Sequence, residues 1–474
     1  MAKKSNEKSS YKTTRGERIS YYLYFLGQNI FYGLVAINIQ TFFSDVGITV
    51  AAIAIIMLIT KVWDAVNDPL MGILIDKVRF KKGRFLPWLR MSLIALAVTS
   101  VGMFLLPVDS SASFKIAWAT IAYIAWSMSY TVCDVPIFIL PTSMTDNVEE
   151  RGSMLTFGRF FAMIGIAGAS VTIPILQARI GWLAVAIIFC VIAVISMLPL
   201  CFKGKERKIV RPEEKVTLKQ MIRYVIGNKY LLIFYLSMFV GGITNFSQYI
   251  TIYFARHNLG NQDMAGIISL LAMIPMLIVG AILPSLIKKT DKFNLYFFCQ
   301  IATAVFGVIR YVGGYADASV FYVLYIIQCF FTGASNILLF TFTLDCLEYG
   351  TYHTGERAEG VVASVQTFFS KLVGSVSGPI AMMILAAFGF ISGENVVQPE
   401  SVADGIWLCM SLFPAFGALL SAGILWFYKL RSKDVQIMAK YNEGTITKEE
   451  ADSQLAEKYG PAATLINMSV STDE

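Results

Sequence analysis

Long apolar stretches separated by short polar connections recur along the whole chain. Each stretch is long enough for a transmembrane helix, which needs about 20 predominantly apolar residues. The pattern therefore predicts an all-α membrane protein with twelve transmembrane helices. The expected spans are 18–43, 49–75, 87–107, 116–143, 153–177, 182–202, 229–255, 263–287, 293–313, 319–344, 361–391 and 404–429.

Composition agrees with a chain that lies in lipid. Hydrophobic residues make up 56% and charged residues 15% of the 474 residues, whereas about a quarter of a soluble domain is charged. The net charge of +7 does not indicate a nucleic-acid partner, because the basic residues lie in connections beside apolar stretches. No phosphate-binding glycine loop, metal-spaced His/Cys set or soluble catalytic domain is visible, so we expect neither an enzyme nor a cofactor.

The basic residues of the connections alternate from one side of the predicted membrane to the other. The N-terminal tail, the second connection and the central connection are rich in Lys and Arg. Because positive charge is retained in the cytoplasm, we expect a multi-pass protein of the plasma (inner) membrane with both termini cytoplasmic. The opposite connections carry few basic residues, namely Lys115, Arg179, Arg256 and Arg310.

The central connection divides the predicted spans into two sets of six, as in transporters built from two pseudo-symmetric six-helix bundles. The tail has one short helical stretch, Thr447 to Tyr459. The expected regions are an N-terminal tail (1–18), a first bundle (19–202), a central loop (203–228), a second bundle (229–430) and a C-terminal tail (431–474).

Within the predicted spans the informative ionisable residues are Asp64, Asp68, Asp134, Arg159 and Lys371. An ionisable side chain at this depth costs several kcal/mol and usually faces a cavity or a partner. Counting about 1.5 Å per residue along each helix places all five at similar depths. The sequence therefore predicts that they surround one cavity.

Asp64 and Asp68 are spaced i, i+4, which puts both carboxylates on one helix face with Asn67 beside them. Two close carboxylates resist ionising together unless a cation or a proton joins them. Pro69 frees a backbone carbonyl at Ala65, which is tolerated where the backbone lines a cavity. The oxygen-rich set predicts a site for Na⁺, with H⁺ as the alternative co-transported ion.

Asp134 lies close to Pro136 in the fourth predicted span. Either it takes part in substrate binding or it pairs with Arg159 and locks two helices together. Arg159 offers a planar fork for sugar hydroxyls or a carboxylate, and Lys371 can neutralise an acid when no cation is bound. Aromatic rings, including those of Tyr32, Tyr130 and Phe138, either stack on a sugar or pack the helices.

Two motifs resemble a known family: Asp64-Ala65-Val66-Asn67-Asp68-Pro69-Leu70-Met71-Gly72 and Lys82-Gly83-Arg84-Phe85-Leu86-Pro87-Trp88. They are similar to the signature of the glycoside-pentoside-hexuronide:cation symporters. The resemblance extends over nearly all of 18–430, with further matches in the fourth, fifth and eleventh spans. It implies the major facilitator fold and a cation-coupled sugar transporter that functions as a monomer in the lipid bilayer.

The resemblance also implies roles for individual residues. The implied cation site is Asp64, Asn67, Asp68 and Thr131, with Na⁺ held by Asp64 and Asp68. The implied sugar site is Gln28, Asn29, Tyr130, Asp134, Phe138, Arg159, Gln366 and Thr367, and Lys371 is the implied coupling residue. The loop after the second span resembles the gate motif of the superfamily, with Gly72, Asp76, Lys77 and Arg84.

Two departures from the family pattern concern the cargo. Asn29 aligns with an acidic residue, and Phe138 aligns with a tryptophan, of the best-known member. The less negative pocket favours a hexuronide, a neutral β-glycoside or a pentoside over an α-galactoside. Two alternatives remain: a cation-coupled lipid or lysolipid carrier of the same fold, and a non-transporting membrane sensor.

Overall fold

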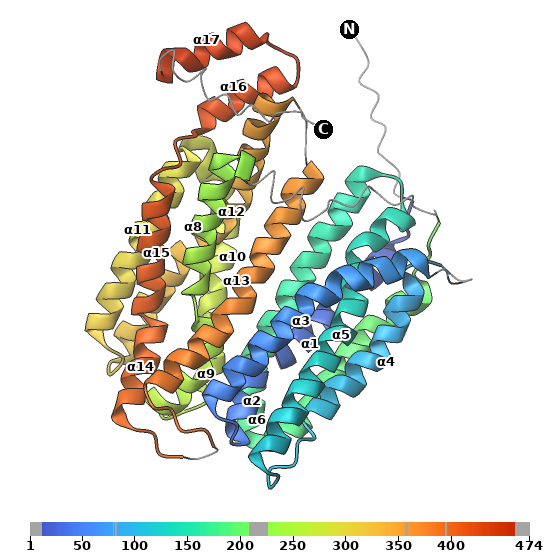
Figure 1. Cartoon of the computed structure of the whole chain (residues 1–474), viewed down its shortest axis with the longest axis vertical. Coiled ribbons are helices and arrows are strands. Elements are labelled where there is room, and N and C mark those ends of the chain that lie inside the picture. Colours follow the sequence, from blue (N-terminus) through green and yellow to red (C-terminus); the bar gives the residue numbers. More distant parts are fainter. Residues whose placement is uncertain are drawn as a thin grey trace. The chain divides into compact units, whose positions relative to one another are not determined.

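The computed structural model describes residues 12–78, 80, 83–207, 226–355, 359–393 and 396–459. These residues form helices throughout and contain no strand, apart from an isolated bridge between Phe80 and Gly83 (Figure 1). The all-α prediction is therefore confirmed.

The helices of the first half follow the predicted spans with one difference. The predicted break between 177 and 182 is reduced to one residue, Gly181, whose φ of 77° is left-handed. The two helices on either side of Gly181 meet there at a kink, and both are included in α6. The helices are α1 (Arg15–Tyr32), the π-helix η1 (Gly33–Ile37), α2 (Ile39–Asp45), α3 (Val50–Lys77), α4 (Leu86–Met103), α5 (Ala112–Met144) and α6 (Val148–Lys203).

The second half contains the remaining spans and two helices in the tail. The predicted tail helix is confirmed as α17, while α16 was not predicted. The helices are α8 (Lys229–Ile243), α9 (Ser247–Tyr253), the π-helix η2 (Phe254–Asn258), α10 (Met264–Lys289), α11 (Lys292–Gly313), α12 (Ala318–Thr354), α13 (Glu359–Ala387), α14 (Glu400–Met410), α15 (Leu412–Leu425), α16 (Ser432–Asn442) and α17 (Lys448–Tyr459).

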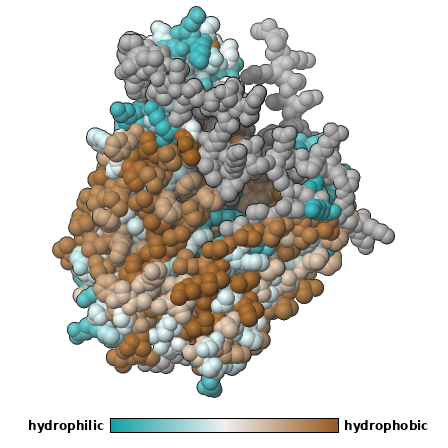
Figure 2. All heavy atoms as spheres, viewed as in Figure 1, coloured by the Kyte–Doolittle hydropathy of each residue, from teal (hydrophilic) through white to brown (hydrophobic). Residues whose placement is uncertain are grey.

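Nine helices or helix runs in the described part of the chain are long and apolar enough to cross a membrane. One of these, Glu150–Lys203, contains two predicted spans that meet at Gly181. The first span is divided among α1, η1 and α2, and the second is α3. The helices are thus consistent with twelve spans. Figure 2 shows hydrophobic side chains over much of the visible helix surface, as expected for helices in lipid.

The described chain divides into two compact units. The first comprises Met1–Glu213, Thr251–Leu270 and Met382–Ala403, and the second comprises Glu214–Ile250, Leu271–Ala381 and Asp404–Glu474. The first unit thus includes η2 and parts of neighbouring helices from the second half of the sequence. Most of the predicted central loop lies outside the described residues, and the division into bundles at that loop stays a prediction.

Helices α1 and α6 of the first unit pack against each other along their lengths. Glycines make this approach possible, because a Cβ at Gly27 would lie 2.4 Å from the Ala193 carbonyl oxygen. A Cβ at Gly165 would lie 2.6 Å from the Leu26 carbonyl oxygen. Small residues let helix backbones approach closely in membranes, so these glycines hold α1 where it carries part of the candidate site.

Candidate functional site

The Asp64 carboxylate joins α3 to α5 in the first unit. Its Oδ2 lies 3.1 Å from the Lys61 Nζ, one turn earlier on α3. Its Oδ1 accepts a hydrogen bond from the Ser127 hydroxyl of α5. The predicted acid is therefore directed at a neighbouring helix, and its negative charge is balanced by Lys61. Neither Lys61 nor Ser127 was among the predicted site residues.

The other predicted cation ligands lie around Asp64. Asn67 is buried, and its amide nitrogen has no acceptor among the described residues. Thr131 is buried one turn after Ser127, and its hydroxyl donates to the Ser127 carbonyl at 3.1 Å. Position 68 lies one turn after Asp64, at the level of Thr131, because the second and fourth spans run in the same direction. The side chain of Asp68 lies outside the described residues.

Asp134 connects α5 to α1. Its Oδ1 accepts a hydrogen bond from the Gln28 side-chain amide at 2.7 Å. Near this bond the Tyr130 ring lies between two aromatic neighbours, with centroid distances of 5.8 Å to Tyr32 and 5.2 Å to Trp126. The structure thus brings together Gln28, Tyr130 and Asp134, which were all predicted for the sugar site. Trp126 lies beside these residues as well, although it was not predicted for the sugar site.

The remaining predicted sugar-site residues of the first unit are Phe138, Arg159 and Asn29, and the first two lie near Phe25 of α1. The Phe138 ring packs at 5.2 Å from Phe25, and the Arg159 guanidinium lies 6.0 Å from the Phe138 ring centroid. Arg159 is exposed, so it is accessible to a ligand. The Asn29 amide donates to the Phe25 carbonyl at 2.9 Å and therefore uses one donor within its own helix.

Three predicted residues lie on α13 of the second unit. Gln366 is half-buried and Lys371 is exposed, while the side chain of Thr367 lies outside the described residues. The spacing of five residues places Gln366 and Lys371 on different sides of the helix, about 140° apart around its axis. Their roles in sugar binding and coupling stay predictions.

The predicted gate loop is anchored by a residue that the sequence did not reveal. Glu206, which follows α6, accepts the backbone N–H groups of Arg84 at 2.8 Å, Phe85 at 2.9 Å and Leu86 at 2.8 Å. A carboxylate at a helix N-terminus satisfies donors that have no partner within the helix. Lys77 is exposed at the end of α3, Gly72 lies within α3, and the side chain of Asp76 lies outside the described residues.

No group of three or more acidic, histidine or cysteine residues that would hold a metal ion occurs among the described residues. The Asp64 neighbourhood offers instead a carboxylate, a hydroxyl and a buried amide on two packed helices. The carboxylate and hydroxyl oxygens are hard donors that suit a monovalent cation rather than a transition metal, whereas the unpartnered Asn67 nitrogen is a hydrogen-bond donor and does not bind a cation. The Asp134, Gln28 and Tyr130 groups lie farther along α5 and on α1, and their predicted role in sugar binding stays a prediction.

The chain is similar to known transporters. A family model described as MFS/sugar transport protein matches residues 20–432. The isoprimeverose transporter of Lactiplantibacillus pentosus is 28% identical over 89% of this chain and 90% of its own length. The glucuronide carrier protein homolog of Escherichia coli is 25% identical over 90% of this chain and 94% of its own length. Among solved structures, the nucleoside transporter NupG matches with a TM-score of 0.62 at 14% identity, covering 88% of this chain and 100% of that one.

Proposed function

Since the chain belongs to the MFS/sugar transport protein family, that of the glycoside-pentoside-hexuronide:cation symporters, we propose that it carries a glycoside, pentoside or hexuronide together with Na⁺ or H⁺. It is a membrane transporter and not an enzyme. The observation that carries the proposal is the Asp64 carboxylate, which is bonded to Ser127 and paired with Lys61 inside two packed apolar helices. An acid at this depth needs a cationic partner.

In the proposed mechanism the cation competes with Lys61 for Asp64. The carboxylate gains Na⁺ or H⁺ as the ammonium moves away, while Asn67, Asp68 and Thr131 complete the site. Ser127 links this event to α5, and Asp134 on the same helix binds the sugar with Gln28 and Tyr130. Each ligand shifts the populations of the outward-open and inward-open states only as far as it binds them differently. Alternating access around one site follows from these linked equilibria.

The direct test is uptake of labelled sugar into proteoliposomes with an imposed Na⁺ or H⁺ gradient. Asp64→Asn and Asp68→Asn are expected to remove the stimulation by the gradient. Asp109→Asn, an exposed acid in the connection after α4, is the matched control and should transport like the unaltered protein. Undiminished gradient-driven uptake by both site variants would exclude this cation site.

The alternative of a lipid or lysolipid cargo predicts stabilisation by acyl chains and no effect of sugars. A thermal-shift screen of glycosides, glucuronides and lysolipids, each with and without Na⁺, separates the two cargo classes because a ligand stabilises the form that it binds. The relatives named for a disaccharide and a glucuronide favour the sugar cargo. We further propose a plasma-membrane location with cytoplasmic termini, on the alternation of basic connections.

A further inference from the structure

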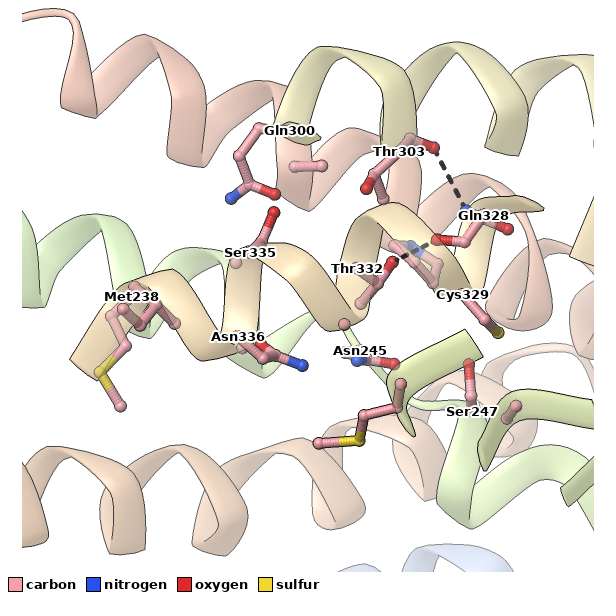
Figure 3. A pocket seen from close by; sticks show the side chains of 18 of the residues that line it. Met238, Asn245, Ser247, Gln300, Thr303, Gln328, Cys329, Thr332, Ser335 and Asn336 are labelled. Carbon is pink, nitrogen blue, oxygen red and sulfur yellow. Dashed lines mark hydrogen bonds between the residues drawn. The ribbon is translucent and has the colours of Figure 1, made fainter. Parts of the chain in front are cut away.

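A polar cavity of about 290 Å³ lies within the second unit, among α8, α10, α11, α12 and α15. Figure 3 shows that its walls carry hydroxyl and amide side chains from several helices. Gln328 lies on one wall, where its side-chain amide donates to the Thr303 carbonyl at 3.3 Å and its backbone carbonyl accepts from the Thr332 hydroxyl at 3.0 Å. The cavity has none of the residues assigned above to the cation or sugar site.

Arg310 lines this cavity and is only 1% exposed. The sequence placed it among the connections, but it lies in the last turn of α11, inside the unit. Its Nη2 donates to the Met410 carbonyl. The face of the guanidinium lies near two rings, with Cζ 5.1 Å from the Tyr325 centroid and 5.8 Å from the Trp407 centroid. These contacts fix the position of the charged group.

The rest of the guanidinium has no acceptor. Arg310 Nε and Nη1 are buried without a hydrogen-bond partner among the described residues. No acidic residue in the described part of the chain forms an ion pair with Arg310. A buried cation without a counter-charge is strongly unfavourable, and more so in a membrane protein. An anion that enters the cavity would remove this cost.

The neighbouring wall offers further donors. Thr303, two turns before Arg310 on the same helix, has a buried hydroxyl without a partner among the described residues, as does Ser335 of α12. Charged nitrogens next to free hydroxyls suit a ligand that combines an anionic group with sugar hydroxyls. A purely structural role for Arg310 accounts for the single bond to Met410 and leaves the two other nitrogens unexplained.

We infer that the cavity beside Arg310 binds an oxyanion, namely the carboxylate or sulfonate of an acidic sugar that this protein transports. The inference rests on the proposed sugar cargo and selects acidic sugars among the candidates. A free inorganic anion accepts the same hydrogen bonds from Arg310, so the test includes one. The bound oxyanion accepts hydrogen bonds from Arg310 Nε and Nη1, and Tyr325 and Trp407 keep the guanidinium in place.

The test compares matched acidic and neutral ligands on the full-length purified protein. Methyl β-glucuronide and methyl β-glucoside are titrated by thermal shift, with sodium sulfate at equal ionic strength as the inorganic probe. A hydrogen bond to a charged group predicts that the unaltered protein prefers the glucuronide by about tenfold or more. In Arg310→Gln this preference should fall to about one, while binding of the glucoside persists.

Two further variants keep the outcome interpretable. Arg431→Gln removes an arginine that lies over Phe293 in the same unit, away from the cavity, and should keep the preference. Gln328→Glu has the same shape as the native residue and adds a resident negative charge to the cavity. This variant loses the hydrogen bond to the Thr303 carbonyl but supplies a negative charge for the buried Arg310. It is expected to fold and to lose the preference, so the test does not depend on the folding of Arg310→Gln.

The results separate the possible occupants. Sulfate is the probe for a free anion. If sulfate stabilises the unaltered protein as much as the glucuronide does, and does not stabilise Gln328→Glu, the occupant of the site is a free anion. No acidic preference and no sulfate effect in the unaltered protein, or effects that survive both cavity variants, would overturn the inference. Gradient-driven uptake of the neutral glucoside would then still support the proposed function, whereas its absence for every sugar would count against that function itself.

Discussion

Arg256 of η2 forms an ion pair with Asp45 at the end of α2, with Nη2 3.1 Å from Oδ2. The Asp45 side chain is 5% exposed, and its Oδ2 also accepts a hydrogen bond from the Trp182 indole at 2.9 Å. Gln262 accepts from Arg256 Nε at 3.1 Å. This buried cluster attaches a segment from the second half of the sequence to the helices of the first half, inside one compact unit.

Asp45→Asn is expected to destabilise the purified protein, because it leaves the Arg256 charge without a counter-charge. Breaking a buried ion pair from one side typically costs about 3–5 kcal/mol. Thermal unfolding in detergent measures the loss. Arg179→Gln is the control, since its ion pair with Asp263 is largely exposed and such pairs contribute about 0–1 kcal/mol. The double variant Asp45→Asn/Arg256→Gln should recover part of the loss, and equal effects of Asp45→Asn and Arg179→Gln would contradict the assignment.

Lys61→Gln is expected to tighten cation binding, because the Lys61 ammonium occupies the carboxylate that the cation needs. Removing a half-buried competitor with an interaction of about 1 kcal/mol predicts a roughly fivefold lower Na⁺ concentration at half-maximal stimulation. The measurement is the Na⁺ dependence of sugar uptake. Lys203→Gln, an exposed lysine at the end of α6, should leave that dependence unchanged. Weaker Na⁺ stimulation in Lys61→Gln would instead make Lys61 a positioning residue for Asp64.

Glu17 at the start of α1 predicts a pH dependence of stability. Burial alone raises the pKa of Glu17, but hydrogen bonds from Arg207 and Thr14 outweigh it and lower the pKa below its ordinary value. Both Arg207 contacts are 2.8 Å long. Because the folded pKa is depressed, this group stabilises the protein above the unfolded pKa of about 4.3. The contribution is lost as the pH falls through the lower, folded value.

Thermal unfolding of the unaltered protein and of Glu17→Gln, followed from neutral to acidic pH, checks this sign. The variant should be less stable at neutral pH, and the two curves should converge on acidification. Glu443→Gln, an exposed acid of the tail, controls for a general loss of negative charge. A difference between Glu17→Gln and the unaltered protein that widens at acidic pH would be the opposite of this expectation.

Two glycines of α6 allow a matched test of the α1–α6 contact. A Cβ at Gly165 would lie 2.6 Å from the backbone oxygen of Leu26, whereas a Cβ at Gly168 would meet no atom within 4 Å. Gly165→Ala is expected to cost about 1–3 kcal/mol through overpacking. Gly168→Ala should be neutral or stabilising by up to about 1 kcal/mol. Thermal unfolding measures the stability of both variants. Equal stabilities would mean that α1 and α6 move apart at no cost in free energy.

The spans were predictable because a transmembrane segment needs a long apolar run. What the sequence did not reveal depends on local backbone geometry. Gly181 joins two spans with a single left-handed residue, and the π-helical segments η1 and η2 leave no pattern in hydropathy.

The candidate site was predictable where a charge stands alone in an apolar run, as for Asp64 and Asp134. Their partners Ser127 and Gln28 carry no charge, so hydropathy did not distinguish them from other polar residues of the spans. Arg310 was counted with the connections because it lies near the end of its apolar run. Burial depends on neighbouring helices that are distant in the sequence, and only the packed structure reveals it.

The glycine contacts between α1 and α6 also limit where the protein is able to bend. With backbone atoms this close, neither helix can slide or tilt on the other without a clash. Gln28, Asn29 and Arg159 are carried by this pair, so the close backbone contacts hold these three positions relative to one another. We therefore expect the proposed transport cycle to bend other helices, and the proposed sugar to meet these three residues in a preformed arrangement.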